Sequence, residues 1–409
     1  MRSSFIARNP SVLWFLLALA VFTLGVTLLS EATGTGMIST SFVKTLGKTL
    51  CLCLIAVAMD VVWGYCGILS LGHFAFFGIG GYAVGMWLMY ARTEIIVLGS
   101  LATAALPPTE KEVVDAIGSQ IFGVVGSSEF PFLWGFADSL FPQLLMVVVV
   151  PGLLALVFGW LAFRSRVTGV YLSILTQAMT LALSLYLFQN DSGLRGNNGL
   201  SGLQNLPGLD HVSQDVISIA FFWASALALG FGYVLFAWIV SGKMGSVIRA
   251  IRDNESRVRF LGYHVETYKL FVFTLTAVVS GIAGALYYPQ AGIINPAEIA
   301  PIASIYLAVW VAIGGRGRLY GAVIGAAFVS LLSSYFTGGS APAINLGFYT
   351  VNWTDWWLVL LGLSFVAVTL FFPKGIGGLF DYLVRIPAPD RVGDYGPDKG
   401  AWRKEEGAP

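Results

Sequence analysis

The chain has 409 residues, of which 56% are hydrophobic and only 11% are charged, and its formal net charge is +1. Soluble domains carry about 25% charged residues, so this composition excludes a soluble protein of this size. It also excludes an intrinsically disordered chain, which needs low hydrophobicity and a high net charge. The net charge gives no field that would attract nucleic acid, and three cysteines (Cys51, Cys53 and Cys66) cannot form a disulfide framework. The composition predicts a polytopic membrane protein.

Ten apolar segments follow one another along the chain, and most are long enough to cross a hydrocarbon core of about 30 Å as a helix. Segment 302–313 is too short to cross alone, so we expect a half-helix or an extension back through Pro301. Segment 11–30 follows Arg2 and Arg8 as a signal peptide would, but it lacks a small-residue cleavage site and is predicted to be a retained first helix. The predicted fold is all-α, with about ten transmembrane helices including short or broken ones, at 11–30, 45–63, 68–90, 143–163, 167–189, 214–240, 270–288, 302–313, 319–337 and 354–372.

The distribution of Lys and Arg predicts the orientation of these spans. Segment 241–269 holds six Lys and Arg residues against three Asp and Glu residues. In 92–142, by contrast, most of the charged residues are acidic. If both termini are cytoplasmic, ten alternating spans place the basic loops inside and 92–142 outside. Residues 1–386 are then a transmembrane domain, and the Pro-, Gly- and charge-rich residues 387–409 are predicted to be a disordered cytoplasmic tail.

The outer stretch contains a predicted amphipathic helix at 109–122, with Thr109 as its N-cap and Glu112 at its third position.

Motifs for catalysis or nucleotide binding are absent from the sequence. Gly47-Lys48-Thr49 matches the end of a phosphate-binding loop, but that loop needs a glycine at position 42, which is Phe. The three histidines, His73, His211 and His264, do not have metal-ligand spacing. We therefore expect no catalytic residues, no metal and no cofactor, and a membrane-embedded enzyme is disfavoured.

A glycine-rich run at 63–82 carries polar residues at membrane depth. Ser70 and His73 are such residues, and polar groups there usually face a bundle interior or an aqueous path. A hydrogen bond between helices is the alternative.

A polar stripe follows in span 167–189, where spacings of three and four residues put Ser173, Thr176, Gln177 and Thr180 on one helix face. Contacts that hold helices together would need the same residue types. We predict that the stripe lines a path for a polar solute, together with Ser70, His73 and Tyr171, and with Asn197 and Asn198 near the outer mouth.

The basic loop contains an amphipathic segment at 242–262. Ile248 and Ile251 lie on its apolar face, charges lie opposite, and Gly262 is placed to end the helix. Such a helix could lie on lipid headgroups or dock in the groove of a partner protein.

Several of these motifs together resemble the branched-chain amino acid ABC permease family. The resemblance runs from about residue 45 to 380. Two further runs are similar to its urea-transporting subgroup, whose permease is a heterodimer of related subunits, and this chain resembles the longer one. It departs from the pattern at Arg195, where a small residue is expected, and in the length of 92–142. The family motifs are at Gly67–Tyr82, Arg249–Glu255 with Leu261-Gly262, Ile313–Gly317 and Gly321–Ala326; the subgroup runs are Gly169–Ala178 and Gly196–Leu200.

The resemblance implies a permease subunit of an ATP-driven importer in a bacterial inner membrane, with urea or a related small amide as the solute. The alternatives are an amino acid importer and, less favoured, a stand-alone transporter or channel. The implied partners are a second, homologous permease subunit, two cytoplasmic ATP-binding subunits, an extracytoplasmic solute-binding protein and membrane lipid. Contacts to the ATPase are expected from the segment 242–262, through Ile248, Arg249, Ile251, Arg252, Asp253, Glu255 and Gly262.

Overall fold

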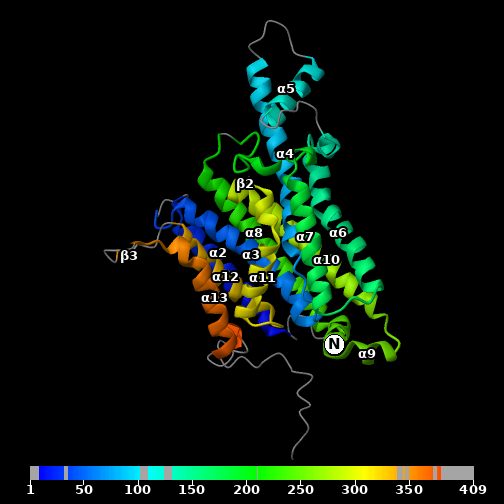
Figure 1. The fold of residues 1–409 in the computed structure, drawn as a ribbon. Coiled ribbons are helices and arrows are strands. Elements are labelled where there is room, and N and C mark those ends of the chain that lie inside the picture. Colours follow the sequence, from blue (N-terminus) through cyan, green and yellow to red (C-terminus); the bar gives the residue numbers. More distant parts are fainter. Residues whose placement is uncertain are drawn as a thin grey trace, which may run out of the picture.

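The computed structural model describes residues 9–31, 36–101, 109–123, 131–209, 211–338, 344–345, 350–371 and 375–378. Long helices run side by side in one bundle, and two helices extend from its upper end (Figure 1). The predicted tail, 387–409, lies outside the described residues.

Eight of the described helices are long and apolar enough to cross a membrane, and two shorter apolar helices accompany them. Each of the ten predicted segments coincides with one of these helices, so the predicted all-α membrane fold is confirmed. The short segment 302–313 is indeed a helix of 14 residues. The long helices are α2 (Pro10–Leu29), α3 (Thr40–Asp60), α4 (His73–Leu101), α6 (Leu140–Arg164), α7 (Val170–Phe188), α8 (Gln214–Ser241), α10 (Val265–Ala291) and α12 (Leu319–Thr337), and the shorter ones are α11 (Pro301–Gly314) and α13 (Trp353–Phe371).

Smaller elements connect the spans. Four two-residue strands form two antiparallel pairs, β1 with β2 and β3 with β4. The connecting elements are α5 (Glu110–Phe122), α9 (Lys243–Phe260), the π-helix η2 (Val61–Tyr65), the 3₁₀ helices η4 (Phe132–Phe136), η5 (Asn190–Ser192), η6 (Gly196–Asn198) and η7 (Pro296–Ile299), and the strands β1 (Leu200–Ser201), β2 (Ile293–Ile294), β3 (Ile344–Asn345) and β4 (Thr350–Val351).

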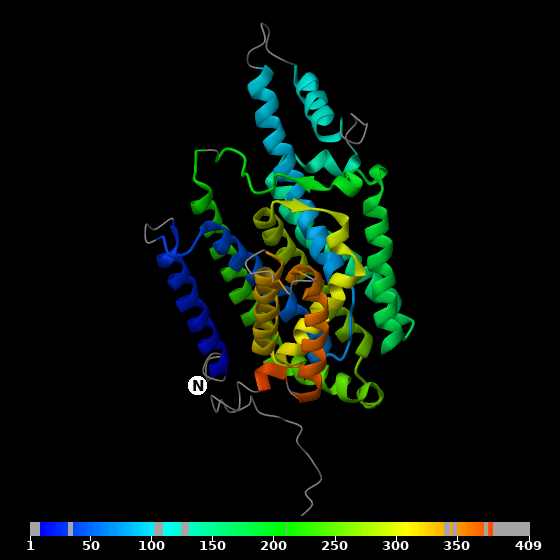
Figure 2. The same cartoon turned by 60° about the vertical axis from the view of Figure 1, so that its left-hand side comes forward.

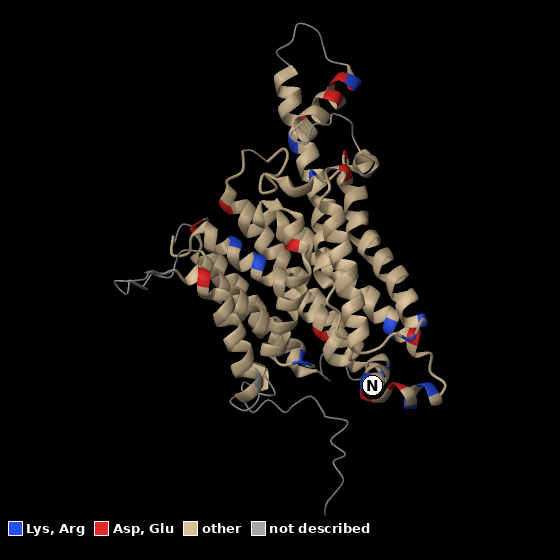
Figure 3. Ribbon diagram, in the orientation of Figure 1, with Lys and Arg blue, Asp and Glu red and all other residues tan. Residues whose placement is uncertain are grey.

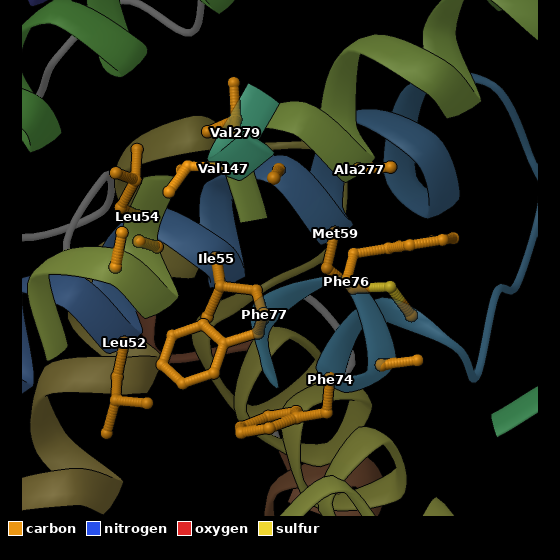
Figure 4. Packing of buried hydrophobic residues seen from close by; sticks show 14 of the residues in the cluster. Leu52, Leu54, Ile55, Met59, Phe74, Phe76, Phe77, Val147, Ala277 and Val279 are labelled. Carbon is orange, nitrogen blue, oxygen red and sulfur yellow. The ribbon is translucent and has the colours of Figure 1, made fainter. Parts of the chain in front are cut away.

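Helix α3 occupies the centre of the bundle. Every residue from Thr49 to Asp60 is buried, because α3 is apolar on all sides and other helices surround it. Figure 4 shows its side chains Ile55 and Met59 packed among Phe76 and Phe77 of α4. By contrast, α2 lies at the margin of the bundle in Figure 2, where Phe15 stacks on Tyr233 of α8 with ring centroids 3.8 Å apart.

Helices α4 and α10 approach each other closely at three glycines. A Cβ atom added to Gly80 would lie 2.0 Å from the carbonyl oxygen of Gly281, and one added to Gly284 would lie 1.8 Å from the carbonyl oxygen of Phe77. Small residues allow such backbone contact between membrane helices, where burial from water cannot drive association.

The outer stretch forms a helical extension above the bundle, made of the end of α4 and of α5 (Figure 1). The predicted helix at 109–122 is confirmed: Thr109 and Glu112 form a capping box at the start of α5. The hydrogen bonds from Thr109 lower the pKa of Glu112. Trp134, which follows α5 in the chain, donates a hydrogen bond of 2.6 Å from Nε1 to the carbonyl oxygen of Gly193 and so holds this part of the chain in place.

We expect Gly284→Val to destabilise the bundle, because its side chain would meet the backbone of α4, which cannot rotate away. Overpacking of this kind costs about 1–3 kcal/mol or more. The matched control is Gly362→Val in α13, where a Cβ would meet nothing within 4 Å. Thermal unfolding of the detergent-solubilised proteins measures the difference, and equal midpoints for the two variants would contradict the packing described.

Candidate functional site

Three sequence motifs meet at the inner end of α3, at a cluster that we call the inner junction: Asp60, Gly64, Arg252 and Gly317. Asp60 is fully buried, and its Oδ1 accepts a hydrogen bond of 2.7 Å from the backbone N–H of Gly317. Arg252 of α9 donates from Nη1 to the carbonyl oxygen of Gly64 at 2.8 Å. The segment 242–262 is therefore joined directly to the central helix.

The glycines of the inner junction are required by its close contacts. A Cβ on Gly64 would lie 2.4 Å from the backbone nitrogen of Gly317, and Gly317 itself has a φ of +78°. A side chain at Gly64 would displace the 315–318 loop, and one at Gly317 would be strained. Gly64 also lies in η2, a π-helix, which is an element that occurs frequently at functional sites.

The apolar face of α9 packs on the rest of this chain. Ile248 and Ile251 are 0% and 3% exposed, and Ile251 lies in a small core with Val258 and Val265. Arg249 donates to the carbonyl oxygen of Val240 at 3.2 Å. Ile248 and Ile251 are therefore covered by the chain itself in this conformation, on the face that periodicity identified.

Helix α9 bends at Asn254, which has non-helical backbone angles, and Asn254 caps the following turn by accepting from the N–H of Arg257. Glu255 points back to the bundle, where it accepts from Lys269 at 2.6 Å and Arg259 at 3.0 Å. Gly262 has a φ of +89° and ends the helix as predicted.

Exposed residues occur along the whole segment 242–262, and its most exposed large apolar side chains stand at its end. Asp253 is exposed, Phe260 is 91% exposed and Leu261 is 76% exposed. Figure 1 shows α9 at the lower end of the bundle. Sequence analysis did not single out Phe260, although its place in the last turn before Gly262 was a usable signal.

Polar side chains of the α7 stripe form hydrogen bonds with the backbone of the non-helical connection 66–72, which lies between η2 and α4. Ser173 donates to the carbonyl oxygen of Leu69 at 2.7 Å, and Thr176 accepts from the backbone N–H of Leu71 at 3.0 Å. Thr180 donates to the carbonyl oxygen of Leu71 at 3.4 Å. These hydroxyls replace hydrogen bonds that the unwound backbone cannot make within itself. They fit the alternative of contacts between helices better than they fit an open path.

The other predicted path residues divide into two groups. Ser70 and His73 are fully buried beside this connection, and His73 Nε2 lies 3.4 Å from the hydroxyl of Thr276. Tyr171 is 77% exposed at the inner end of α7, whereas Asn197 and Asn198 are exposed at its outer end, so the structure does not bring these three together with the buried residues. Gln177 is half-buried between the two groups.

We expect Thr176→Val to lower stability by about 1–3 kcal/mol, because it leaves the N–H of Leu71 without its acceptor in a dry environment. Thr337→Val is the matched control, since that hydroxyl is exposed and bonds only within its own helix. Thermal unfolding compares the two variants, and a Thr176→Val protein as stable as the control would show that the connection does not depend on this bond.

Figure 3 shows charged residues mainly at the two ends of the bundle, with a few between them. Two charged residues of the described chain, Lys48 of α3 and Glu298 of η7, are half-buried. Sequence analysis named Lys48 only within Gly47-Lys48-Thr49 and did not single out Glu298.

The chain matches the family model described as branched-chain amino acid transport system / permease component, over residues 41–369. It is 23% identical over 370 residues to the high-affinity branched-chain amino acid transport system permease protein LivM of Escherichia coli, an alignment covering 83% of this chain and 71% of that protein. No solved structure matches it.

Two archaeal proteins of Methanocaldococcus jannaschii are also similar, both described as probable branched-chain amino acid transport permease proteins. One, LivM, is 21% identical, with 79% of this chain and 89% of that protein covered. The other, LivH, is 27% identical, with 52% and 59% covered.

Proposed function

Because this chain belongs to the family of branched-chain amino acid transport permeases, we propose that it forms the transmembrane path of an ATP-driven importer for a small polar solute. The observation that carries this proposal is the inner junction, where a cytoplasmic helix is hydrogen-bonded to the central membrane helix. In an importer driven by a cytoplasmic ATPase, movement of the ATPase has to reach the membrane helices through a connection of this kind.

The importer would consist of this chain, a second homologous permease subunit, two cytoplasmic ATP-binding subunits and an extracytoplasmic solute-binding protein, in a bacterial inner membrane. We place α9 and both termini on the cytoplasmic side, since the Lys and Arg residues of 241–269 and of 316–318 lie at the same end of the bundle. ATP hydrolysis belongs to the partner, and this chain is the transport subunit.

The segment 242–262 remains our proposed coupling segment. One part of it would contact the ATPase, and another part contacts the rest of this chain. Its exposed tip, Asp253, Phe260 and Leu261, would bind the ATPase, and burial of a Phe side chain contributes about 1.5–3 kcal/mol to such docking. Three residues that contact the rest of the chain, buried Ile248 and Ile251 and partly exposed Arg252, would transmit movement of the tip to α3.

We expect Arg252→Ala to uncouple ATP hydrolysis from transport, because it removes the charge-assisted hydrogen bond to Gly64, worth about 1.5–3 kcal/mol. Reconstituted complexes should then move about 10-fold fewer solute molecules per ATP while the ATPase stays bound. Arg257→Ala is the matched control on the exposed side of the same helix. An unchanged solute-to-ATP ratio in the Arg252→Ala complex would rule out the transmitting role.

We propose urea or a related amide as the solute, with a branched-chain amino acid as the second candidate. Two sequence runs, Gly169–Ala178 and Gly196–Leu200, support urea, and half-buried Gln177 and exposed Asn197 offer neutral donors and acceptors to it. The relatives LivM and LivH, whose printed names give branched-chain amino acids, support the second candidate.

Uptake by proteoliposomes that hold the full complex decides between the two solutes. We expect ATP-dependent accumulation of labelled urea in the presence of its binding protein, and none of labelled leucine. Accumulation of leucine alone would overturn the urea assignment. Accumulation of neither solute, or uptake by this chain without an ATPase, would overturn the proposed function in favour of a different transporter class.

A further inference from the structure

A pocket of about 190 Å³ lies between the C-terminal part of α4 and the loop 202–209, at the end of the bundle opposite α9 (Figure 1). An engineered protein cavity of about 150 Å³ is large enough to hold benzene, so this pocket has room for an organic molecule of several non-hydrogen atoms. We call it the α4 pocket. Its lining residues are Arg92, Ile95, Ile96, Asn205, Leu206 and Pro207.

Most of the α4 pocket is apolar. Ile95 and Ile96 of α4 are 43% and 47% exposed, and Leu206 and Pro207 face them from the loop as half-buried residues. A ligand that covers these side chains removes apolar surface from water, which favours binding. Pockets for small molecules commonly combine such walls with a few polar groups that fix the orientation of the ligand.

The polar groups of the α4 pocket are mainly donors, and one of them is charged. Arg92 donates from Nη1 to the carbonyl oxygen of Gly202 at 3.3 Å, and in the described part of the chain it forms no ion pair within 4.0 Å. Most of its five N–H groups therefore remain available. The Oδ1 atom of Asn205 accepts from Gln214 at 3.4 Å, which leaves the Asn205 amide N–H groups as donors. Donors around a guanidinium group suit a carboxylate.

The loop that forms one wall of the pocket is held in place by hydrogen bonds. Leu203 is fully buried and donates from its backbone N–H to the carbonyl oxygen of Gly292 at 3.0 Å. Gly202 has a φ of +77°, and a Cβ atom there would lie 2.1 Å from Nη1 of Arg92, so glycine permits their close approach. A wall that is already ordered reduces the conformational entropy that a ligand has to remove on binding.

We propose that the α4 pocket binds a small carboxylate with a short, branched apolar tail. The carboxylate accepts hydrogen bonds from Arg92 and Asn205, and the tail covers the four apolar residues. A branched-chain amino acid has the same two ends, but it also carries an ammonium group, and none of the six lining residues is acidic. The pocket therefore favours the carboxylate without the ammonium group. This ligand is not the transported solute, so the inference goes beyond the proposed function.

Isothermal titration of the detergent-solubilised full chain tests the ligand class, with 4-methylpentanoate as the probe. We expect saturable binding of this probe. Acetate, which has no tail, and 4-methylpentanamide, which has no charge, should each bind about tenfold more weakly or worse. Leucine should also bind more weakly than 4-methylpentanoate. Absence of binding, or equal affinities for the probe and acetate, would overturn the site, and tighter binding of leucine would overturn the ligand class.

Two pairs of variants locate the binding. Arg92→Met should weaken binding of 4-methylpentanoate about tenfold or more, whereas Lys111→Met removes a positive charge from exposed α5 and should have no effect. Ile96→Asn should weaken binding as well, and Leu98→Asn is its matched control, since Leu98 is 45% exposed on the same helix but does not line the pocket.

Ile96→Asn also guards against a folding defect, because Ile96 is half exposed and, unlike Arg92, makes no side-chain hydrogen bond to the loop. Native affinity in both Arg92→Met and Ile96→Asn would overturn the site. Because the titration measures binding to this chain and not uptake by the complex, such a result would leave the proposed function intact.

Discussion

The bundle depends on how it satisfies the backbone of residues 66–72, which leave helical geometry in a largely buried region. An unpaired backbone group in such surroundings costs several kcal/mol, so each one needs a partner from another element. Thr176 and Ser173 of α7 supply partners for this connection, and Ser304 of α11 accepts from the N–H of Phe74, at the start of α4. The break therefore fixes the positions of α7 and α11 relative to the central helix.

The same break brings the end of α3 within reach of α9. Because η2 ends the helix in a π-turn, the carbonyl of Gly64 is accessible to Arg252, and Asp60 is left to bind the 315–318 loop. If α3 continued as a straight helix, the carbonyl oxygen of Gly64 would accept a hydrogen bond within that helix. Glycines at 64 and 317 are the sequence requirement of this arrangement, since their backbones are almost in contact.

Hydropathy and charge were sufficient to predict the ten spans and the cap of α5, because these features depend on residues near one another in the chain. The contacts of α9 could not be predicted in the same way. Periodicity identified Ile248 and Ile251 as one apolar face, but periodicity does not show what covers a face, and the covering residue Val265 lies beyond the segment. Spacing was sufficient to place Ser173, Thr176 and Thr180 on one face of α7, but their hydrogen bonds to backbone groups of 69–71 have no signature in the sequence.

The ladder between β1 and β2 has only two residues in each strand, but it joins the loop after α7 to the chain that leads into η7. Leu203 adds a further hydrogen bond to the carbonyl oxygen of Gly292 at 3.0 Å, and Gly199 packs against Ile294. The surface around Asn197 is therefore connected to η7 through backbone hydrogen bonds. A shift of that surface would be carried along the ladder to η7 and from there into α11, which follows it in the chain.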